Sequence, residues 1–207
     1  MSAKDHPSSY YVWIDTEFSS LELEQAHILQ LAAMVTTPDL RRVVPAEQDL
    51  VLSVALAPNQ KISPWVEENI PAVVAACRGP DAIPLAELDV RLCNFIDAIV
   101  GGTAEEISSR PVLAGNSLHA DWFLLRRFTP RFLERLHYRM IDVSSLKLQW
   151  LDHFSGAPFE KDQVENLCAY FPDLNVPDGA APHDAYYDIQ ASAAELAYYR
   201  SQLVRQT

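Results

Sequence analysis

Two carboxylate side chains follow an apolar run near the start of the chain. The segment YVWIDTE places Asp15 and Glu17 directly after residues 11–14. Because side chains alternate between the two faces of a strand, both acids would project to the same side at its C-terminal end. Neighbouring carboxylates raise each other's pKa unless a cation lies between them. The spacing therefore indicates a divalent-cation site, and the alternative is a pair of solvated acids at a turn.

A third acid, Asp121, follows a second apolar run. Residues 111–114 (PVLA) are predicted to form a short buried strand, which turns at Gly115 into a helix beginning near His119. If this strand lies parallel to the first, Asp121 comes to lie beside the first two acids. The alternative is an acid in a first helical turn, which the helix dipole stabilises without any metal.

The sequence PHDAYYD adds a histidine and a fourth acid at the start of the last predicted helix. His183 and Asp188 are five residues apart, a separation that turns a helix by about 140°. The two side chains therefore share a face only if His183 lies in or before the first turn, and Pro182 favours that boundary. A capping or surface role is the alternative for His183, and Asp184 is the alternative acid.

The residue types in this set define the chemistry. Oxygen ligands without clustered histidine or cysteine suit Mg²⁺ or Mn²⁺ better than zinc. Two such ions about 4 Å apart activate a water and stabilise the leaving oxygen of a phosphodiester, while a neutral histidine accepts the water's proton. The four acids and His183 therefore indicate phosphodiester hydrolysis with two divalent cations.

The elements that must position these residues are a sheet and its covering helices. Three consecutive strands are predicted first, and they must pair antiparallel because no helix fits between them. The remaining strands alternate with helices, which is typical of a mixed sheet with helices on its faces. The predicted strands cover 10–14, 26–37, 49–56, 111–114 and 137–143, and the predicted helices cover 63–70, 85–100, 119–128, a short segment after Thr129–Pro130, 144–154 and 183–203, with a loop at 171–182.

The composition is that of one globular domain, for which we expect residues 1–207 with a flexible N-terminus at 1–9. The hydrophobic fraction is 49% and the charged fraction 21%, and no apolar stretch approaches the ~20 residues that span a bilayer. The first residues lack the basic region followed by an apolar region that is typical of an export signal, and three distant cysteines favour neither disulfides nor a zinc knuckle. We therefore expect a cytoplasmic protein that does not enter a membrane.

Three stretches of the sequence resemble a known family. The segments WIDTEFSSLELEQAHILQLAAMVT, LAGNSLHADWFLLRRFTPRFLERLHYRMIDVSSLK and HDAYYDIQASAAELAYYR are similar to oligoribonucleases of the DEDDh group of 3'-to-5' exonucleases. The resemblance implies an α/β ribonuclease H-like fold and a homodimer that cleaves RNA fragments of two to five nucleotides to 5'-mononucleotides. It also implies two bound Mg²⁺ or Mn²⁺ ions.

The resemblance assigns roles to individual positions. The metal ligands would be Asp15, Glu17, Asp121 and Asp188, with His183 as the general base. The substrate contacts would be Leu21 and Trp65 around the bases, Asn116 and Ser117 near the substrate, and Tyr138 and Arg139 reaching its 5' side from the partner subunit. A core aromatic is the alternative interpretation of Trp65.

The sequence also departs from the family pattern. FSSL at 18–21 stands where methionine, threonine, glycine and leucine are usual, His119–Ala120 replaces glycine and glutamine, and residues 151–182 match poorly. The FSSL segment would change the turn that shapes the pocket of the 3' nucleotide. The poor match at 151–182 leaves the substrate contacts of the C-terminal loop unassigned by the resemblance.

The net charge of −12 counts against a broad nucleic-acid interface, because phosphate contacts need basic residues. A dinucleotide has few phosphates, however, and bound divalent ions offset part of the acidity. Two alternatives remain open. One is a DEDDh exonuclease acting on longer single-stranded DNA or RNA, and the other is a non-catalytic binding module, for which loss of one or more acids would be the usual mark.

Overall fold

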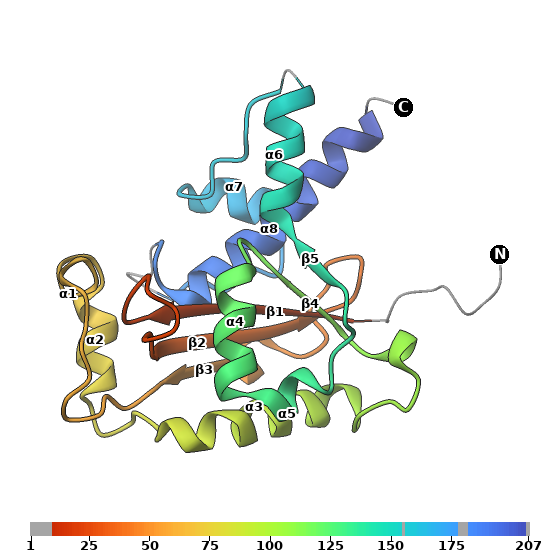
Figure 1. Ribbon diagram of the computed structural model, residues 1–207. Coiled ribbons are helices and arrows are strands. Elements are labelled where there is room, and N and C mark those ends of the chain that lie inside the picture. Colours follow the sequence, from red (N-terminus) through yellow and green to blue (C-terminus); the bar gives the residue numbers. More distant parts are fainter. Residues whose placement is uncertain (1–9, 155, 178–181, 206–207) are drawn as a thin grey trace.

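Figure 1 shows a computed structural model of the chain, which describes residues 10–154, 156–177 and 182–205. The N-terminal segment 1–9, for which a flexible conformation is expected, lies outside the described residues, as do positions 178–181 of the predicted loop. Among the helices of the described part, none is long and apolar enough to cross a membrane.

The described residues form a five-stranded sheet in the order β3-β2-β1-β4-β5. The first three strands pair antiparallel, whereas β4 is parallel to β1 and β5 is parallel to β4. The predicted fold class, a mixed sheet of three antiparallel strands followed by parallel ones, is confirmed. The strands are β1 (Tyr11–Phe18), β2 (Ile28–Thr36), β3 (Leu50–Ser53), β4 (Val112–Gly115) and β5 (Met140–Asp142).

The first strand is longer than predicted. β1 continues to Phe18, so Asp15 and Glu17 lie inside the strand, opposite Ala32 and Gln30 of β2. The predicted end at residue 14 was wrong because β1 keeps its antiparallel pairing with β2 as far as Phe18, although its pairing with β4 ends at Trp13. The prediction that both acids share one face holds, since they alternate with Thr16.

Each face of the sheet has its own hydrophobic core. Trp13 packs with residues of α8 on one face, whereas Val12 and Ile14 pack with α3, α4 and α5 on the other. Figure 1 shows α6 and α7 lying with α8 on one side of the sheet and α3 and α5 on the opposite side. These helices are α3 (Leu85–Val100), α4 (His119–Phe128), α5 (Pro130–Leu133), α6 (Val143–His153), α7 (Val164–Tyr170) and α8 (Ala185–Arg205).

Two short helices, α1 (Pro64–Asn69) and α2 (Pro71–Cys77), cover one end of the sheet. The Ser63 hydroxyl accepts a hydrogen bond from the backbone N–H of Val66, which confirms Ser63 as the predicted cap. Residues of both helices pack around Leu29 in a third hydrophobic cluster. Neither α2 nor α7 was predicted from the sequence.

The remaining boundaries show where side-chain chemistry ends an element. β5 covers only 140–142 of the predicted 137–143, because the Asp142 carboxylate already accepts from the N–H of Ser144 and starts α6. β4 ends at Gly115, where an added Cβ would lie 2.8 Å from the carbonyl oxygen of Ile14. Only glycine permits this close approach of β4 to β1.

Candidate active site

The acids of β1 face the start of α8, where His183 precedes the helix and Asp188 lies in its first turn. Asp15 and Glu17 lie on the same face as Trp13, which packs against α8. One ligand atom each from Glu17, His183 and Asp188 lies within 4.8 Å of the others. The structure therefore brings residues from the two ends of the chain together in an arrangement that could hold a cation.

Asp121 reaches the same place from the opposite face of the sheet. It lies in the first turn of α4, as predicted, and its side chain is buried. The hydroxyl of Thr16, between the two acids of β1, donates a hydrogen bond of 2.7 Å to its Oδ1. The charge of Asp121 is close enough to Asp15 to raise the pKa of that carboxyl. Thr16 thus fixes the third acid at the strand that carries the first two.

The N-terminus of α8 is fixed by Asp184 and Gln30. Oδ1 of Asp184 accepts from the backbone N–H groups of Tyr186 and Tyr187, at 2.9 and 3.2 Å. Gln30, opposite Glu17 on β2, accepts from the N–H of Ala185 at 2.9 Å. Asp184 therefore acts as a helix cap, and Asp188 is the acid that meets Glu17 and His183.

His183 precedes the helix, as the shared face with Asp188 requires. Its backbone is in the left-handed region, with φ of 68°, and its N–H donates to Oδ2 of Asp188 at 2.9 Å. The imidazole is exposed. The other oxygen of Asp188, Oδ1, is buried and receives no hydrogen bond from any residue that the structure describes. This buried oxygen lies 3.6 Å from the Lys161 ammonium, beyond a hydrogen bond, and a carboxylate oxygen left in this way is suited to a cation.

The raised pKa values of the acids also indicate a cation site. Burial, followed by the charges of Asp121, Asp188 and Glu17, raises the pKa of Asp15 well above its usual value. Burial and then the charge of Asp188 raise the pKa of Glu17 to about 8. Burial raises the pKa of Asp121 to about 6, although the hydrogen bond from Thr16 lowers it. Asp15 and Glu17 therefore resist ionisation near neutral pH unless a positive charge lies beside them, which divalent cations would supply.

Two exposed apolar side chains border the acids. Leu21 is 89% exposed and Trp65 is 51% exposed, which excludes the core interpretation of Trp65. The indole packs edge-on against the His183 ring, with 5.4 Å between centroids. The Ser19 carbonyl in the FSSL turn accepts from the N–H of Ser63 at 2.9 Å. That bond joins the turn carrying Leu21 to the start of α1, which carries Trp65.

Asn116 and Ser117 support the connection between β4 and α4. The Asn116 amide donates to Ser192 Oγ at 3.0 Å and to Glu195 Oε2 at 2.9 Å, both on α8. The N–H of Ser117 donates to the Asp142 carboxylate at 3.0 Å. Asn116 is thus engaged inside the protein, whereas Ser117 remains exposed.

Tyr138 and Arg139 lie on a different surface of the same chain. Tyr138 is 71% exposed, stacks on His137 at 4.4 Å, and has the Arg139 guanidinium 5.5 Å above its ring. Both residues line a cavity of about 180 Å³ together with Trp122, and none of the four acids lines it. Within one chain, the structure therefore does not bring Tyr138 and Arg139 into the carboxylate cluster.

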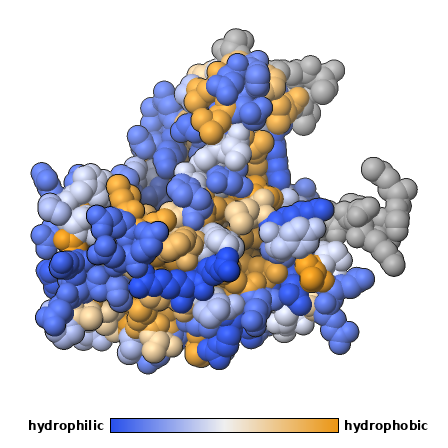
Figure 2. Space-filling view, in the orientation of Figure 1, coloured by the Kyte–Doolittle hydropathy of each residue, from blue (hydrophilic) through white to orange (hydrophobic). Residues whose placement is uncertain are grey.

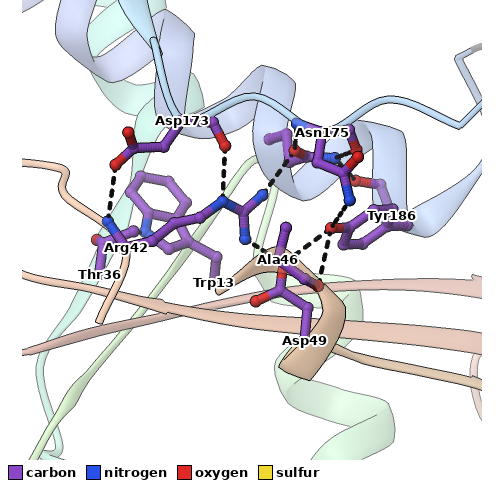
Figure 3. A network of polar contacts seen from close by, with 9 residues as sticks. Trp13, Thr36, Arg42, Ala46, Asp49, Asp173, Asn175 and Tyr186 are labelled. Carbon is purple, nitrogen blue, oxygen red and sulfur yellow. Dashed lines mark hydrogen bonds and ion pairs between the residues drawn. The ribbon is translucent and has the colours of Figure 1, made fainter. Parts of the chain in front are cut away.

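The sequence did not reveal a network that holds the first turns of α8. The Arg42 guanidinium donates to Gln190 at 2.7 Å, donates to the Asp173 carbonyl at 2.7 Å, and forms an ion pair with buried Asp49 (Figure 3). The Tyr186 hydroxyl donates to the same Asp49 carboxylate at 2.9 Å. Tyr186 and Gln190 flank Asp188 by two residues on each side. The network therefore fixes the segment of α8 that presents Asp188.

Lys161 was also missed. Its ammonium lies 3.6 Å from Oδ1 of Asp188, and it comes from the segment that matches the family pattern poorly. No local signal in the sequence separates it from other surface lysines, because its partner is 27 residues away.

Residues 12–196 match the RNase T family, whose members are described as exonucleases. The chain belongs to this family. Its membership confirms the resemblance to DEDDh nucleases, and the protein is a 3'-to-5' exonuclease that hydrolyses phosphodiesters. This member of the family has the ribonuclease H-like fold that was expected.

The chain is similar in sequence to named oligoribonucleases and similar in fold to several solved nucleases. The oligoribonuclease of Corynebacterium diphtheriae is 32% identical over 94% of this chain and 84% of its own, and the mitochondrial oligoribonuclease of Bos taurus is 26% identical over 99% and 78%. The zinc-bound complex of E. coli ExoI with single-stranded DNA aligns with a TM-score of 0.65 at 16% identity, over 96% of this chain but only 42% of that one. The Mg²⁺- and Mn²⁺-bound form of S. pombe Pop2p aligns with a TM-score of 0.57 at 14% identity, over 95% and 85%.

Proposed function

We propose that this exonuclease removes 5'-mononucleotides from the 3' end of short RNA fragments of two to five nucleotides, dinucleotides above all. The observation that carries the proposal is the contact of Trp65 with His183 beside the acids of β1 and α8. An exposed aromatic at the hydrolytic site can stack on a terminal base while the adjacent phosphodiester meets the acids. The similarity to oligoribonucleases over nearly the whole chain supports the same substrate class.

The donor set fits two Mg²⁺ or Mn²⁺ ions held by Asp15, Glu17, Asp121 and Asp188. These are oxygen ligands, three of their carboxyl groups have raised pKa values, and Oδ1 of Asp188 is buried without a hydrogen bond from the described residues. Bound there, such ions would make a water acidic and stabilise the charge of the leaving oxygen.

The protein's own residues would complete the reaction. His183 is exposed and is held by its N–H to Asp188, so its ring can accept a proton from the attacking water. Leu21 and Trp65 are joined through Ser19 and Ser63 and would enclose the bases of the substrate. Ser117, exposed at the start of α4, would lie near the substrate, whereas Asn116 would act by holding that connection in place.

A homodimer would complete the site. Tyr138 and Arg139 lie away from the acids of their own chain, so they can reach a 5' end only from a partner. Exposed apolar residues continue along β5 and α6 as Met140, Leu148 and Leu151, and Figure 2 shows hydrophobic surface on the projecting α6. Such a patch favours a two-fold contact between copies.

The proposal is tested with end-labelled RNA of two to twenty nucleotides and Mg²⁺. Catalytic efficiency should be highest for two to five nucleotides and fall steeply for longer chains, because Tyr138 and Arg139 would close the 5' side. Equal efficiency on two and twenty nucleotides would instead favour an exonuclease for longer strands. If RNA of no length were cleaved, the result would favour the non-catalytic binding module. The expected cytoplasmic location stays a prediction.

A further inference from the structure

Lys161 places a positive charge at the carboxylate cluster. Its Nζ lies 3.6 Å from Oδ1 of Asp188, within range of an ion pair but beyond a hydrogen bond. The residue belongs to the turn between α6 and α7, and its side chain is 36% exposed. The ammonium also lowers the pKa of Asp15 and of Glu17, so its charge acts on three of the four acids.

The backbone of Lys161 is fixed to the helix that carries Asp188. The hydroxyl of Tyr187, a buried residue next to Asp188, donates a hydrogen bond of 2.6 Å to the Lys161 carbonyl oxygen. The lysine is therefore attached at the site by its main chain, while its long side chain can still change direction. Loss of one carboxylate partner would leave the ammonium close to the cluster.

We propose that Lys161 binds the phosphate group of the nucleotide at the hydrolytic site. Once divalent cations neutralise the acids, the ammonium has no anionic partner among them and can pair with the phosphate group held beside the cations. The protein carries a net charge of −12, so attraction of an anion to this site needs a local positive charge. The inference rests on the proposed metal site.

A contact with phosphate would also help the reaction. Negative charge grows on the phosphate oxygens as the bond to the leaving oxygen breaks, and a fixed positive charge stabilises that state. Lysine suits this purpose because its ammonium is a compact point charge with three donors.

The chain supplies a matched control in Lys147. Its Nζ lies 3.9 Å from Glu195, a buried acid of α8, and its side chain is 39% exposed. Lys147 and Lys161 thus have similar exposure and similar partners on the same helix, but Glu195 is not one of the four proposed ligands. Replacing Lys147 controls for the loss of a lysine paired with α8.

The test measures binding of the product adenosine 5'-monophosphate, and of adenosine, to full-length protein in Mg²⁺ by calorimetry. Lys161→Ala should weaken binding of the monophosphate about tenfold, equal to about 1.4 kcal/mol, and leave adenosine binding unchanged. Lys161→Arg should lose less, and Lys147→Ala should match the wild type. Mg²⁺ affinity is titrated in parallel with each protein, and circular dichroism checks that each is folded.

Three results would overturn the proposal. Unchanged monophosphate binding with tighter Mg²⁺ binding would make Lys161 only a counter-ion of the acids. Equal weakening of the monophosphate and of adenosine would make its role structural. A wild type that does not bind the monophosphate in Mg²⁺ would also refute it. Failure of the proposed function is seen separately, as wild-type protein that binds the monophosphate but does not cleave dinucleotides.

Discussion

The imidazole of His183 packs edge-on against the indole of Trp65, with 5.4 Å between their centroids. One residue precedes the last helix and the other lies in the first turn of a short helix 118 residues earlier. The indole therefore orients an exposed ring whose backbone is already held by Asp188. In the proposed mechanism, nucleobase binding by Trp65 and proton transfer by His183 would both depend on this one aromatic contact.

His183→Ala should reduce the turnover of a dinucleotide roughly 10²- to 10⁴-fold, because the attacking water loses its proton acceptor. The loss should shrink as pH rises and hydroxide becomes more abundant. Steady-state rates between pH 6 and 9 measure both effects. His153→Ala, at an exposed histidine in the last turn of α6, serves as the control and should stay close to the wild type. If His183→Ala turned over the dinucleotide as fast as the wild type at neutral pH, His183 would not be the general base.

Thr16→Val removes the hydroxyl that donates to Asp121. A hydrogen bond to a charged group contributes roughly 1.5–3 kcal/mol, so the free energy of unfolding should fall by about that amount in denaturant titrations. The pKa of Asp121 should rise further, because this bond lowers it. More Mg²⁺ should then be needed for half-maximal rate, with a larger defect at pH 6 than at pH 8. Thr16→Ser should behave as the wild type, and an unchanged Mg²⁺ dependence of Thr16→Val would contradict the role of the bond.

The raised pKa values predict a pH-dependent response to metal. The pKa of Glu17 is about 8 in the folded protein and 4.5 for the ordinary group, so between these values the metal-free folded state holds more protons than the unfolded state. This acid therefore lowers stability as pH rises across that window, and Asp121 does so between 3.8 and about 6. Divalent cations bind the ionised acids, so the increase in Tm caused by Mg²⁺ should grow from pH 5 to pH 8.

Scanning calorimetry with Mg²⁺ or with chelator measures this difference. Glu17→Gln removes one titrating group, so the metal-free Tm of this variant should vary less with pH. An equal Mg²⁺-induced shift at pH 5 and pH 8 would show that protons and metal do not compete for these acids.

Arg42→Met should destabilise the protein by about 3–5 kcal/mol, because Asp49 would remain buried without its counter-charge. Urea denaturation measures the change. Arg41→Met is the control, since the neighbouring Arg41 is exposed and a surface substitution there should change stability by no more than about 0.5 kcal/mol. Adding Asp49→Asn to Arg42→Met should restore part of the loss. If Arg42→Met were as stable as Arg41→Met, Arg42 would not stabilise α8.

Co-expression tests the shared site. Asp15→Asn disables the acids of its own subunit, whereas Tyr138→Ala disables the site of its neighbour, so each homodimer should be nearly inactive. By two-fold symmetry about half of the mixed population is heterodimer with one intact site, which gives roughly a quarter of the wild-type rate. A mixture no more active than the average of the two variants would show that Tyr138 does not act in trans.

Local patterns explain why much of the site was predictable. The apolar run before Asp15 and the Gly115 turn before Asp121 identify two parallel strands and the helix at their ends. Pro182 favoured a helix boundary at His183; the helix was predicted at 183–203, and α8 begins two residues later, at Ala185. Each of these signals lies within a few residues of the side chain concerned.

The missed features depend on residues far apart in the sequence. Arg42 meets Gln190 across 148 positions, and a charged residue after a strand gives no sign of such a partner. The helices α2 and α7 have only seven residues each, and they are stabilised by packing against β2 and α8 more than by their own propensity. Tertiary contacts, not local preference, decide these elements.

Gly115 is a position at which this sequence should not tolerate substitution during evolution. Any other residue would place a Cβ 2.8 Å from the carbonyl oxygen of Ile14, directly before Asp15. Relief of that contact would move β4 away from β1 and carry α4, with Asp121, out of reach of the other acids. Gly102, which has open space around it, is free to vary. Natural variation should therefore be absent at Gly115 and common at Gly102, although each glycine lies at or just after the end of a regular element.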